Sequence, residues 1–266
     1  MMELSLFSSP VLTAFGVTLA AGLATVLGAL FVARADPSNP RLLSVALAFS
    51  GGAMVYVSLV EIFGKSVSYL SEAHGDRTGY ALATLALFGG IALLVLLDRL
   101  VPNPHAGLAA RDDASRAALA RVGLITALAI TAHNLPEGLA TFFATLDDPV
   151  VGASLAVAIA LHNIPEGVSV AVPVFYATGS RRRAVQAAFL SGLAEPAGAL
   201  LGYLVLAPFL SPTLLGVLFG AIAGVMVFLA LDELLPTAKR YAAGHETAYG
   251  MVGGMGVLAL SLVLLR

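Results

Sequence analysis

The stretches ITAHNLPEGLA at residues 130–140 and ALHNIPEGVSV at residues 160–170 interrupt two apolar segments with almost the same polar residues. Each stretch contains a histidine, an asparagine, a proline and a glutamate. An ionisable side chain within a membrane span costs about 2.5–3.5 kcal/mol on insertion scales, so its presence there indicates a function. Because the phrase occurs twice in consecutive apolar segments, a purely structural role is a poor explanation for both copies.

The composition predicts an all-α, polytopic membrane protein. Of the 266 residues, 59% are hydrophobic and only 11% are charged, whereas a soluble domain carries about 25% charged residues. Several apolar segments reach the roughly 20 residues that cross a bilayer core. Helices are expected because backbone groups that face lipid must satisfy their own hydrogen bonds. The chain has no cysteine, which excludes disulfides and thiolate metal sites.

We expect residues 1–266 to form a single transmembrane transport domain, one bundle of eight transmembrane helices. The predicted spans are residues 11–33, 41–63, 79–100, 119–145, 150–176, 184–208, 212–235 and 247–265. The polar stretch 101–117 is rich in Pro, Gly, Asp and Ser and predicts a cytoplasmic loop.

The basic residues predict the orientation of the bundle. With the N-terminus outside, only Lys65, Arg77 and Arg266 of the fourteen Lys and Arg residues lie on the outer side. This asymmetry follows the positive-inside rule. It places both termini away from the cytoplasm, which requires an even number of spans. The first residues lack the basic region and cleavage site of a signal peptide.

The spacing within each phrase predicts a metal site. His133 and Glu137 are four residues apart, as are His162 and Glu166. Residues four apart in a helix share one face, with Cβ atoms about 5–6 Å apart. The asparagine that follows each histidine lies on a neighbouring stripe. Two such helices facing each other would enclose two histidines, two asparagines and two glutamates, a set that suits zinc, iron, manganese or cobalt.

The two prolines indicate that backbone carbonyls line a water-filled cavity within the membrane span. Pro136 and Pro165 each leave a carbonyl four residues earlier without its helical donor, and we expect kinks there. Such carbonyls are tolerated where they line a cavity, as in transporters. A third phrase, SGLAEPAGAL at residues 191–200, fits the same pattern and adds Glu195 as a candidate ligand.

HNLPEG and HNIPEG, followed by the Glu-Pro segment, resemble the ZIP family of divalent metal transporters. GGAMVYVSLVEIF at residues 51–63 and LDELLPTAKRYA at residues 231–242 resemble most its bacterial ZupT-like branch. The resemblance implies eight helices, with an inverted repeat that relates helices 1–3 to helices 6–8 around helices 4–5. It also implies a metal site midway across the membrane, often binuclear. The transported ion would be zinc first, with iron, manganese, cobalt or cadmium also possible.

The resemblance implies two sets of ligands that share two glutamates. One metal would be held by His133, Glu137, His162 and Glu166, and its neighbour by Asn134, Glu137, Asn163, Glu166 and Glu195. Glu137 and Glu166 would then bridge the two ions. Asn163 stands where the family usually carries an aspartate, which makes the second site less negative and is compatible with softer specificity.

Three further acidic residues have two interpretations each. Glu61 lies near the outer end of the second predicted helix, where it is an entrance ligand or proton acceptor, or an interfacial charge near Lys65. Asp232 and Glu233 lie at the cytoplasmic end of the seventh predicted helix. They form an exit site, or they are boundary charges near Lys239.

The leading hypothesis is a carrier that moves divalent metal into the cytoplasm across the bacterial inner membrane. Its partners would be divalent metal ions and the lipid bilayer, with no nucleic acid and no prosthetic group, and a homodimer stays open. A selective metal channel would show the same ligands. An intramembrane zinc hydrolase would need a non-ligand base beside an open metal position, as in HExxH, whereas both glutamates here occupy ligand positions. We therefore expect no enzymatic activity.

The predicted orientation can be tested by labelling. A cysteine introduced at Gly75 should react with a membrane-impermeant thiol reagent added to intact cells, and a cysteine at Ala109 should react only after permeabilisation. The cysteine-free parent chain provides the blank. The opposite labelling pattern would refute the orientation.

Overall fold

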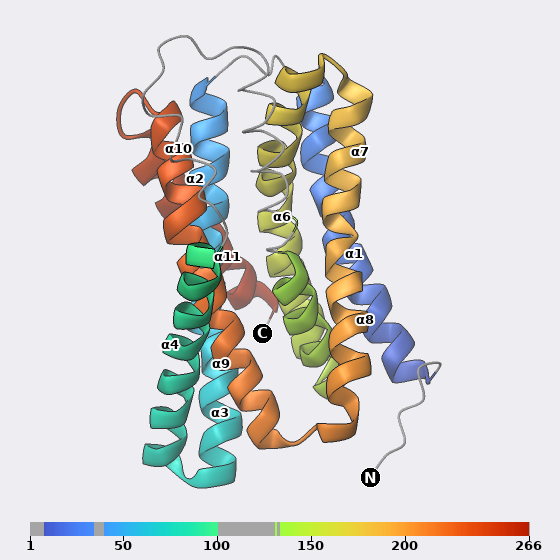
Figure 1. The fold of residues 1–266 in the computed structure, drawn as a ribbon, viewed down its shortest axis with the longest axis vertical. Helices are drawn as coiled ribbons and strands as arrows, with labels where there is room; N and C mark the ends of the chain where they lie inside the picture. Colours follow the sequence, from blue (N-terminus) through green and yellow to red (C-terminus); the bar gives the residue numbers. More distant parts are fainter. Residues whose placement is uncertain (1–7, 35–39, 101–130, 132–133, 266) are drawn as a thin grey trace.

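The computed structural model describes residues 8–34, 40–100, 131 and 134–265, and this part of the chain is helical and contains no strand (Figure 1). In the described residues, 7 helices are long and apolar enough to cross a membrane. The prediction of an all-helical, multi-pass membrane protein is confirmed. The remaining predicted span, 119–145, is described only at residue 131 and from residue 134 onward, so the count of eight stays a prediction. The stretch 101–117 lies outside the described residues.

Within residues 40–100 and 134–265, successive helices follow one another with short connections. The described helices are α1 (Ser9–Arg34), α2 (Pro40–Val57), η1 (Ser58–Ile62), α3 (Phe63–His74), α4 (Asp76–Leu100), an unlabelled helix at residues 134–147, α6 (Pro149–Thr178), α7 (Arg181–Gly192), α8 (Ala194–Leu206), η2 (Ala207–Phe209), α9 (Pro212–Leu229), η3 (Ala230–Leu234), α10 (Leu235–Tyr241) and α11 (Glu246–Leu265). Side chains cap several of them. Asp148, for example, accepts hydrogen bonds from the backbone N–H groups of Val150 and Val151 at the start of α6, as expected of an N-cap aspartate.

Two predicted helix ends are wrong. The sequence predicts that the second and seventh helices end at residues 63 and 235, but they continue as α3 to His74 and as α10 to Tyr241. Each passes through one π-helical segment, η1 or η3. In α3 the polar residues have partners on α9. Ser66 donates to the carbonyl of Gly216 at 2.6 Å, and the Lys65 ammonium lies 5.9 Å from the centroid of the Phe219 ring.

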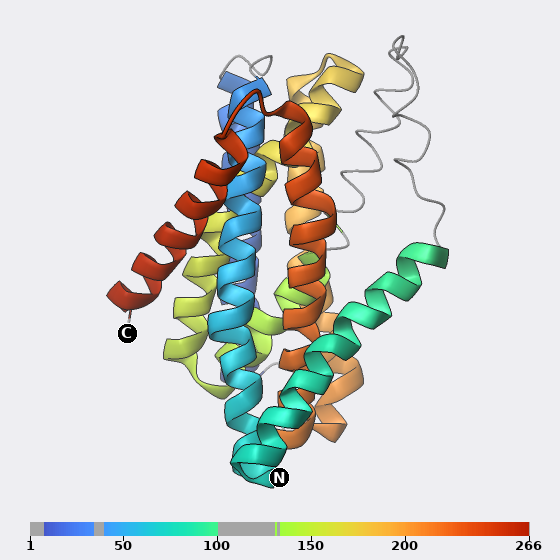
Figure 2. The same cartoon turned by 90° about the vertical axis from the view of Figure 1, so that its left-hand side faces the viewer.

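The helices pack in two groups. The α6 group contains α1, α6, α7 and α8, in which α1 packs on α6 and α7, and residues 134–147, whose Gly138 lies against the backbone of Glu195. The α2 group contains α2, η1, α3, α4, α9, η3, α10 and α11, in which α2 packs on α11 and α9 packs on α3 and α4. The groups meet where α6 packs against α2 and α11. Figure 2 shows α4 and α11 inclined to the upright helices of the bundle.

Glycines bring the helix backbones together inside each group. A Cβ at Gly28 would stand 1.9 Å from the carbonyl oxygen of Ile164, which joins α1 to α6. In the α2 group, a Cβ at Gly90 would stand 2.1 Å from the carbonyl oxygen of Ala221. Among the described glycines, every such approach to another helix's backbone stays within one group. Small residues at crossings allow this close approach of membrane helices.

Gly90 and its neighbour Gly89 form a matched pair for testing this packing. Gly90→Ala should lower the melting temperature of the purified protein, because overpacking at a tight site costs about 1–3 kcal/mol. A Cβ at Gly89 would meet no atom of another helix within 4 Å, so Gly89→Ala should leave the melting temperature unchanged or slightly raised. Equal melting temperatures for the two variants would contradict the close crossing of α4 and α9.

Candidate metal centre

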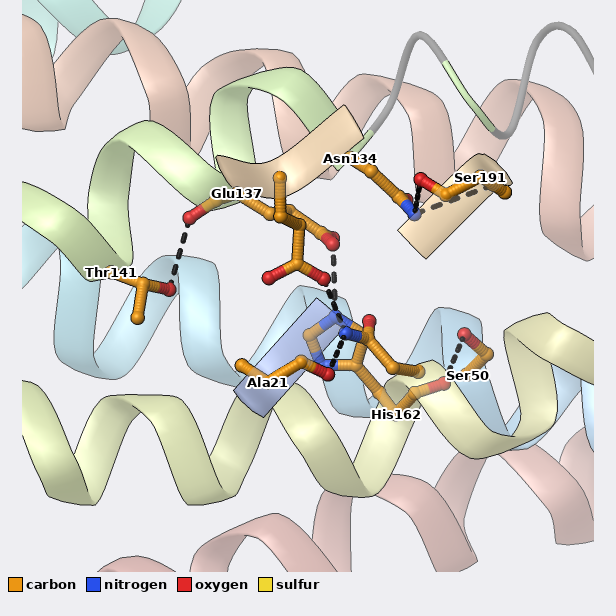
Figure 3. A network of polar contacts seen from close by, with 9 residues as sticks. Ala21, Ser50, Asn134, Glu137, Thr141, His162 and Ser191 are labelled. Carbon is orange, nitrogen blue, oxygen red and sulfur yellow. Dashed lines mark hydrogen bonds and ion pairs between the residues drawn. The ribbon is translucent and has the colours of Figure 1, made fainter. Parts of the chain in front are cut away.

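Three buried side chains from two helices meet in the α6 group. Glu137 comes from the helix at residues 134–147, and His162 and Glu166 come from α6. One ligand atom from each side chain lies within 4.8 Å of the others. The Nε2 atom of His162 lies 3.1 Å from Oε1 of Glu137 (Figure 3). The set of one imidazole and two carboxylates suits a divalent transition metal.

The short connection between the two helices places these residues opposite each other. Asp148 alone separates the helix at residues 134–147 from α6, so the chain reverses there. The helices approach closely beside the turn, since a Cβ at Gly152 would stand 2.2 Å from the Cα of Thr145. Further from the turn, Glu137 and His162 face one another across the same helix pair. The i, i+4 spacing of His162 and Glu166 then brings the second carboxylate to the same place.

Two asparagines flank this group, and their amide nitrogens are held by the surrounding helices. Nδ2 of Asn134 donates to the carbonyl oxygen of Ser191 at 3.0 Å and lies 3.4 Å from its hydroxyl oxygen (Figure 3). Nδ2 of Asn163 donates to the carbonyl oxygen of Ala21 at 2.9 Å and to Oε1 of Glu195. Asn134, Asn163 and Glu195 are all completely buried.

Several ligand-type atoms of these residues are buried without a hydrogen-bond partner in the described part of the chain. They are Oδ1 of Asn134, Nδ1 of His162, Oδ1 of Asn163, Oε1 and Oε2 of Glu166, and Oε2 of Glu195. Buried polar atoms are normally hydrogen-bonded, so each exception needs an explanation. Five of these six atoms are oxygens, which accept hydrogen bonds and bind cations. A metal ion is a partner that would satisfy them together.

The charges in the site lead to the same conclusion. Glu137, Glu166 and Glu195 are at most 2% exposed, and Glu137 acts electrostatically on both other carboxyl groups. Burying an uncompensated carboxylate costs several kcal/mol. Two or three carboxylates in one buried site therefore require protons or a cation. A divalent ion would compensate the two carboxylates beside His162.

Of the seven predicted ligand residues, the structure groups Glu137, His162 and Glu166 within reach of one ion. Asn163 lies against Glu195, and Asn134 is buried against Ser191; a ligand role for these three residues stays a prediction. His133 lies outside the described residues. Pro165 does not interrupt α6, which is helical from Pro149 to Thr178. A break does precede Pro196, where α7 ends and α8 begins at Ala194.

The other three predicted residues lie in the π-helical segments and not at helix ends. Glu61 is in η1, and Asp232 and Glu233 are in η3. Glu61 and Glu233 are half-buried, whereas Asp232 is exposed. None of the three belongs to the ligand group formed by Glu137, His162 and Glu166 among the described residues. π-helical turns inside α-helices are frequent at functional sites.

Sequence reasoning missed three residues that hold the site. The carbonyl groups of Ala21 and Ser191 accept from the two asparagines. The Ser50 hydroxyl of α2 donates to the carbonyl oxygen of His162 at 3.3 Å, and this contact joins the two helix groups. Ala21 and Ser191 act through backbone carbonyls, so their side chains give no sequence signal. Ser50 carries a weak signal, a hydroxyl beside two glycines in an apolar span.

These features define a multi-pass helical membrane protein with a buried site of histidine, carboxylate and amide groups. Residues 103–262 match the family described as "ZIP Zinc transporter". The chain is 61% identical to a zinc transporter ZupT of Xanthomonas axonopodis pv. citri, over 95% of this chain and 94% of that protein. It is 60% identical to a ZupT of Neisseria meningitidis serogroup B, over 94% and 95% of the two chains. A ZupT of Lysinibacillus sphaericus is 50% identical, over 96% and 98%.

The chain therefore belongs to the ZIP family, and the resemblance drawn from HNLPEG and HNIPEG is confirmed. The three relatives share its length almost completely. Membership of this family agrees with the long apolar helices of the described residues.

Zinc binding at this site should be measurable as thermal stabilisation of the purified protein, because a ligand that binds only the folded state raises its stability. The stabilisation should shrink between about pH 7 and about pH 5, since imidazole and carboxylate ligands must lose protons to bind metal. Glu166→Gln should abolish it. The control is Glu246→Gln. Glu246 is the first residue of α11, and its carboxylate lies 3.5 Å from the Arg41 side chain and outside the metal site. Full stabilisation of the Glu166→Gln protein by zinc would exclude Glu166 as a ligand.

Proposed function

We propose that this protein transports zinc across the bacterial inner membrane into the cytoplasm. The observation that carries the proposal is the buried group of Glu137, His162 and Glu166 in a chain of the ZIP family. The group offers borderline and hard donors and no thiolate, so iron, manganese, cobalt and cadmium are also candidate substrates. The metal is cargo that binds and leaves.

The proposed ligand sets are taken from the two motifs HNLPEG and HNIPEG and from Glu195. One ion is held by His133, Glu137, His162 and Glu166, and a second by Asn134, Glu137, Asn163, Glu166 and Glu195, with both glutamates bridging. The buried oxygens of Asn134, Asn163 and Glu195 that lack partners among the described residues support the second set. Because Asn163 is neutral where the family usually carries an aspartate, the second set is less negative than an aspartate-containing set would be.

A carrier fits the helix arrangement better than a channel does. Glu137 and His162 have no exposed surface and Glu166 is 2% exposed, so all three side chains are shielded from solvent in the described structure. The site's described residues belong to the α6 group, and close glycine contacts tie that group together. The Ser50 hydroxyl of the α2 group reaches the site across the interface. Relative movement of the two groups would expose the site while keeping its ligands in place.

The two π-helical segments support the inverted repeat. η1 and η3 have the same length, and each has a glutamate, Glu61 or Glu233, as its fourth residue. The flanking contacts also correspond, because α2 packs on α11 and α9 packs on α4. We propose that Glu61 serves metal entrance and that Asp232 and Glu233 serve metal exit. The assignment of entrance and exit follows from the predicted orientation, with both termini outside the cytoplasm.

Amide substitution of the two bridging glutamates tests this function. Glu137→Gln and Glu166→Gln keep the shape of the side chain but remove the charge that offsets the cations in a buried site of low dielectric. Each should abolish transport of every metal at unchanged membrane abundance. Asn134→Ala removes one neutral ligand and should change only affinity or selectivity. The measurement is the initial rate of metal uptake into liposomes against metal concentration.

Failure of the unaltered protein to move zinc in this assay would refute the proposed transport. Substantial zinc transport by the Glu137→Gln protein would instead refute only the bridging role of Glu137.

A further inference from the structure

The two backbone carbonyls that hold the asparagine amides come from neighbouring positions on two helices. Ala21 of α1 accepts from Asn163, and Ser191 of α7 accepts from Asn134. Both carbonyls are followed directly in the chain by a glycine, Gly22 or Gly192. On each helix, therefore, the backbone carbonyl that accepts a hydrogen bond from an asparagine side chain belongs to the residue before a glycine.

Gly22 and Gly192 lie against each other. A Cβ at Gly22 would stand 2.3 Å from the carbonyl oxygen of Gly192, and a Cβ at Gly192 would stand 2.2 Å from the carbonyl oxygen of Gly22. The contact is reciprocal, so α1 and α7 cross at this point with their backbones touching. No other residue type fits at either position without moving the helices apart. The carbonyls of Ala21 and Ser191 lie directly beside the crossing.

We propose that the Gly22–Gly192 crossing is a positioning element that turns both asparagine oxygens toward the metal. This inference rests on the proposed transport function and names residues that act without touching the ion. An asparagine amide presents a carbonyl oxygen at one side and an NH₂ group at the other, and only the oxygen binds a cation. The crossing binds the NH₂ group of Asn134 and of Asn163, which leaves their Oδ1 atoms buried and free of partners in the described chain.

Outer partners of this kind orient a ligand before the metal arrives, and their loss typically costs about 10–100-fold in metal affinity or activity. Without the two carbonyl acceptors, each amide could rotate and present its NH₂ group to the ion. Glu195 also accepts from Asn163, so Asn163 keeps one acceptor when the crossing is disturbed. Asn134 has only Ser191 as its acceptor among the contacts described. The effect should therefore be larger through Asn134.

The first test compares two equally crowded glycines. Gly192→Ala should raise the KM for zinc uptake about tenfold, with a smaller change in the maximal rate per folded protein. Gly90→Ala is the matched control, because its Cβ would meet Ala221 as closely but lies in the α2 group, away from both asparagines. It should lower thermal stability without changing KM. Equal KM values for the two variants would overturn the positioning role.

The second test asks whether Gly192 acts through Asn134. An aspartate has two equivalent oxygens, so its orientation does not decide which atom meets the metal. Asn134→Asp should therefore restore the KM of the Gly192→Ala protein to within about threefold of the Asn134→Asp single variant, a coupling that a mutant cycle detects. A tenfold difference that persists in the aspartate background would show that Gly192 acts by another route.

Ser191→Ala tests the hold on the Asn134 amide without adding a methyl group at the helix crossing. It removes the hydroxyl 3.4 Å from Nδ2 of Asn134 and keeps the carbonyl, so we expect a smaller rise in KM that also disappears with Asn134→Asp. If Gly192→Ala fails to fold, Gly22→Ala disturbs the same crossing from α1, and an unchanged KM for that variant would contradict the proposal. In every case the unaltered protein is assayed beside the variants. Zinc uptake by that protein separates failure of this inference from failure of the transport function.

Discussion

The burial of three carboxylates in a membrane-embedded core is the constraint on which the rest of the site depends. Glu137, Glu166 and Glu195 have almost no exposed surface, and lipid around the bundle offers them no solvation. Each must be compensated by a proton, a donor or a cation. The helix pair joined at Asp148 brings two of them to one histidine, and the third lies against Asn163. The ionised site has a high free energy when it is empty, and a bound divalent ion lowers that free energy. This difference favours metal binding.

The packing of the α6 group follows from the need to hold these side chains at short range. Gly138 lies against the backbone of Glu195, Gly167 against Thr25, and Gly22 against Gly192. Each contact brings a second helix within reach of the ligands. The group therefore forms a compact unit, and its contacts to the α2 group include those of α6 with α2 and α11. A unit tied in this way could move relative to its surroundings without losing its ligand geometry.

The parts of the fold and site that follow local rules could be predicted from the sequence. Apolar length identified the spans, and the i, i+4 spacing of His162 and Glu166 placed both on one helix face, because helical geometry is independent of the rest of the chain. Long-range contacts could not be predicted. The acceptors of the asparagine amides are carbonyls of Ala21 and Ser191, 142 and 57 residues away in sequence, and any residue has a carbonyl. The second helix extends past Lys65 because α9 supplies partners for that turn, which composition alone does not reveal.

The central claim is that the transported ion binds between the two helices joined at Asp148. Anomalous X-ray diffraction at the zinc absorption edge, from crystals of the purified protein grown with zinc, tests it most directly. The account predicts an anomalous peak within about 2.0–2.2 Å of a ligand atom from each of Glu137, His162 and Glu166. A zinc-loaded, transport-competent protein whose anomalous peaks all lie away from these three side chains would contradict it.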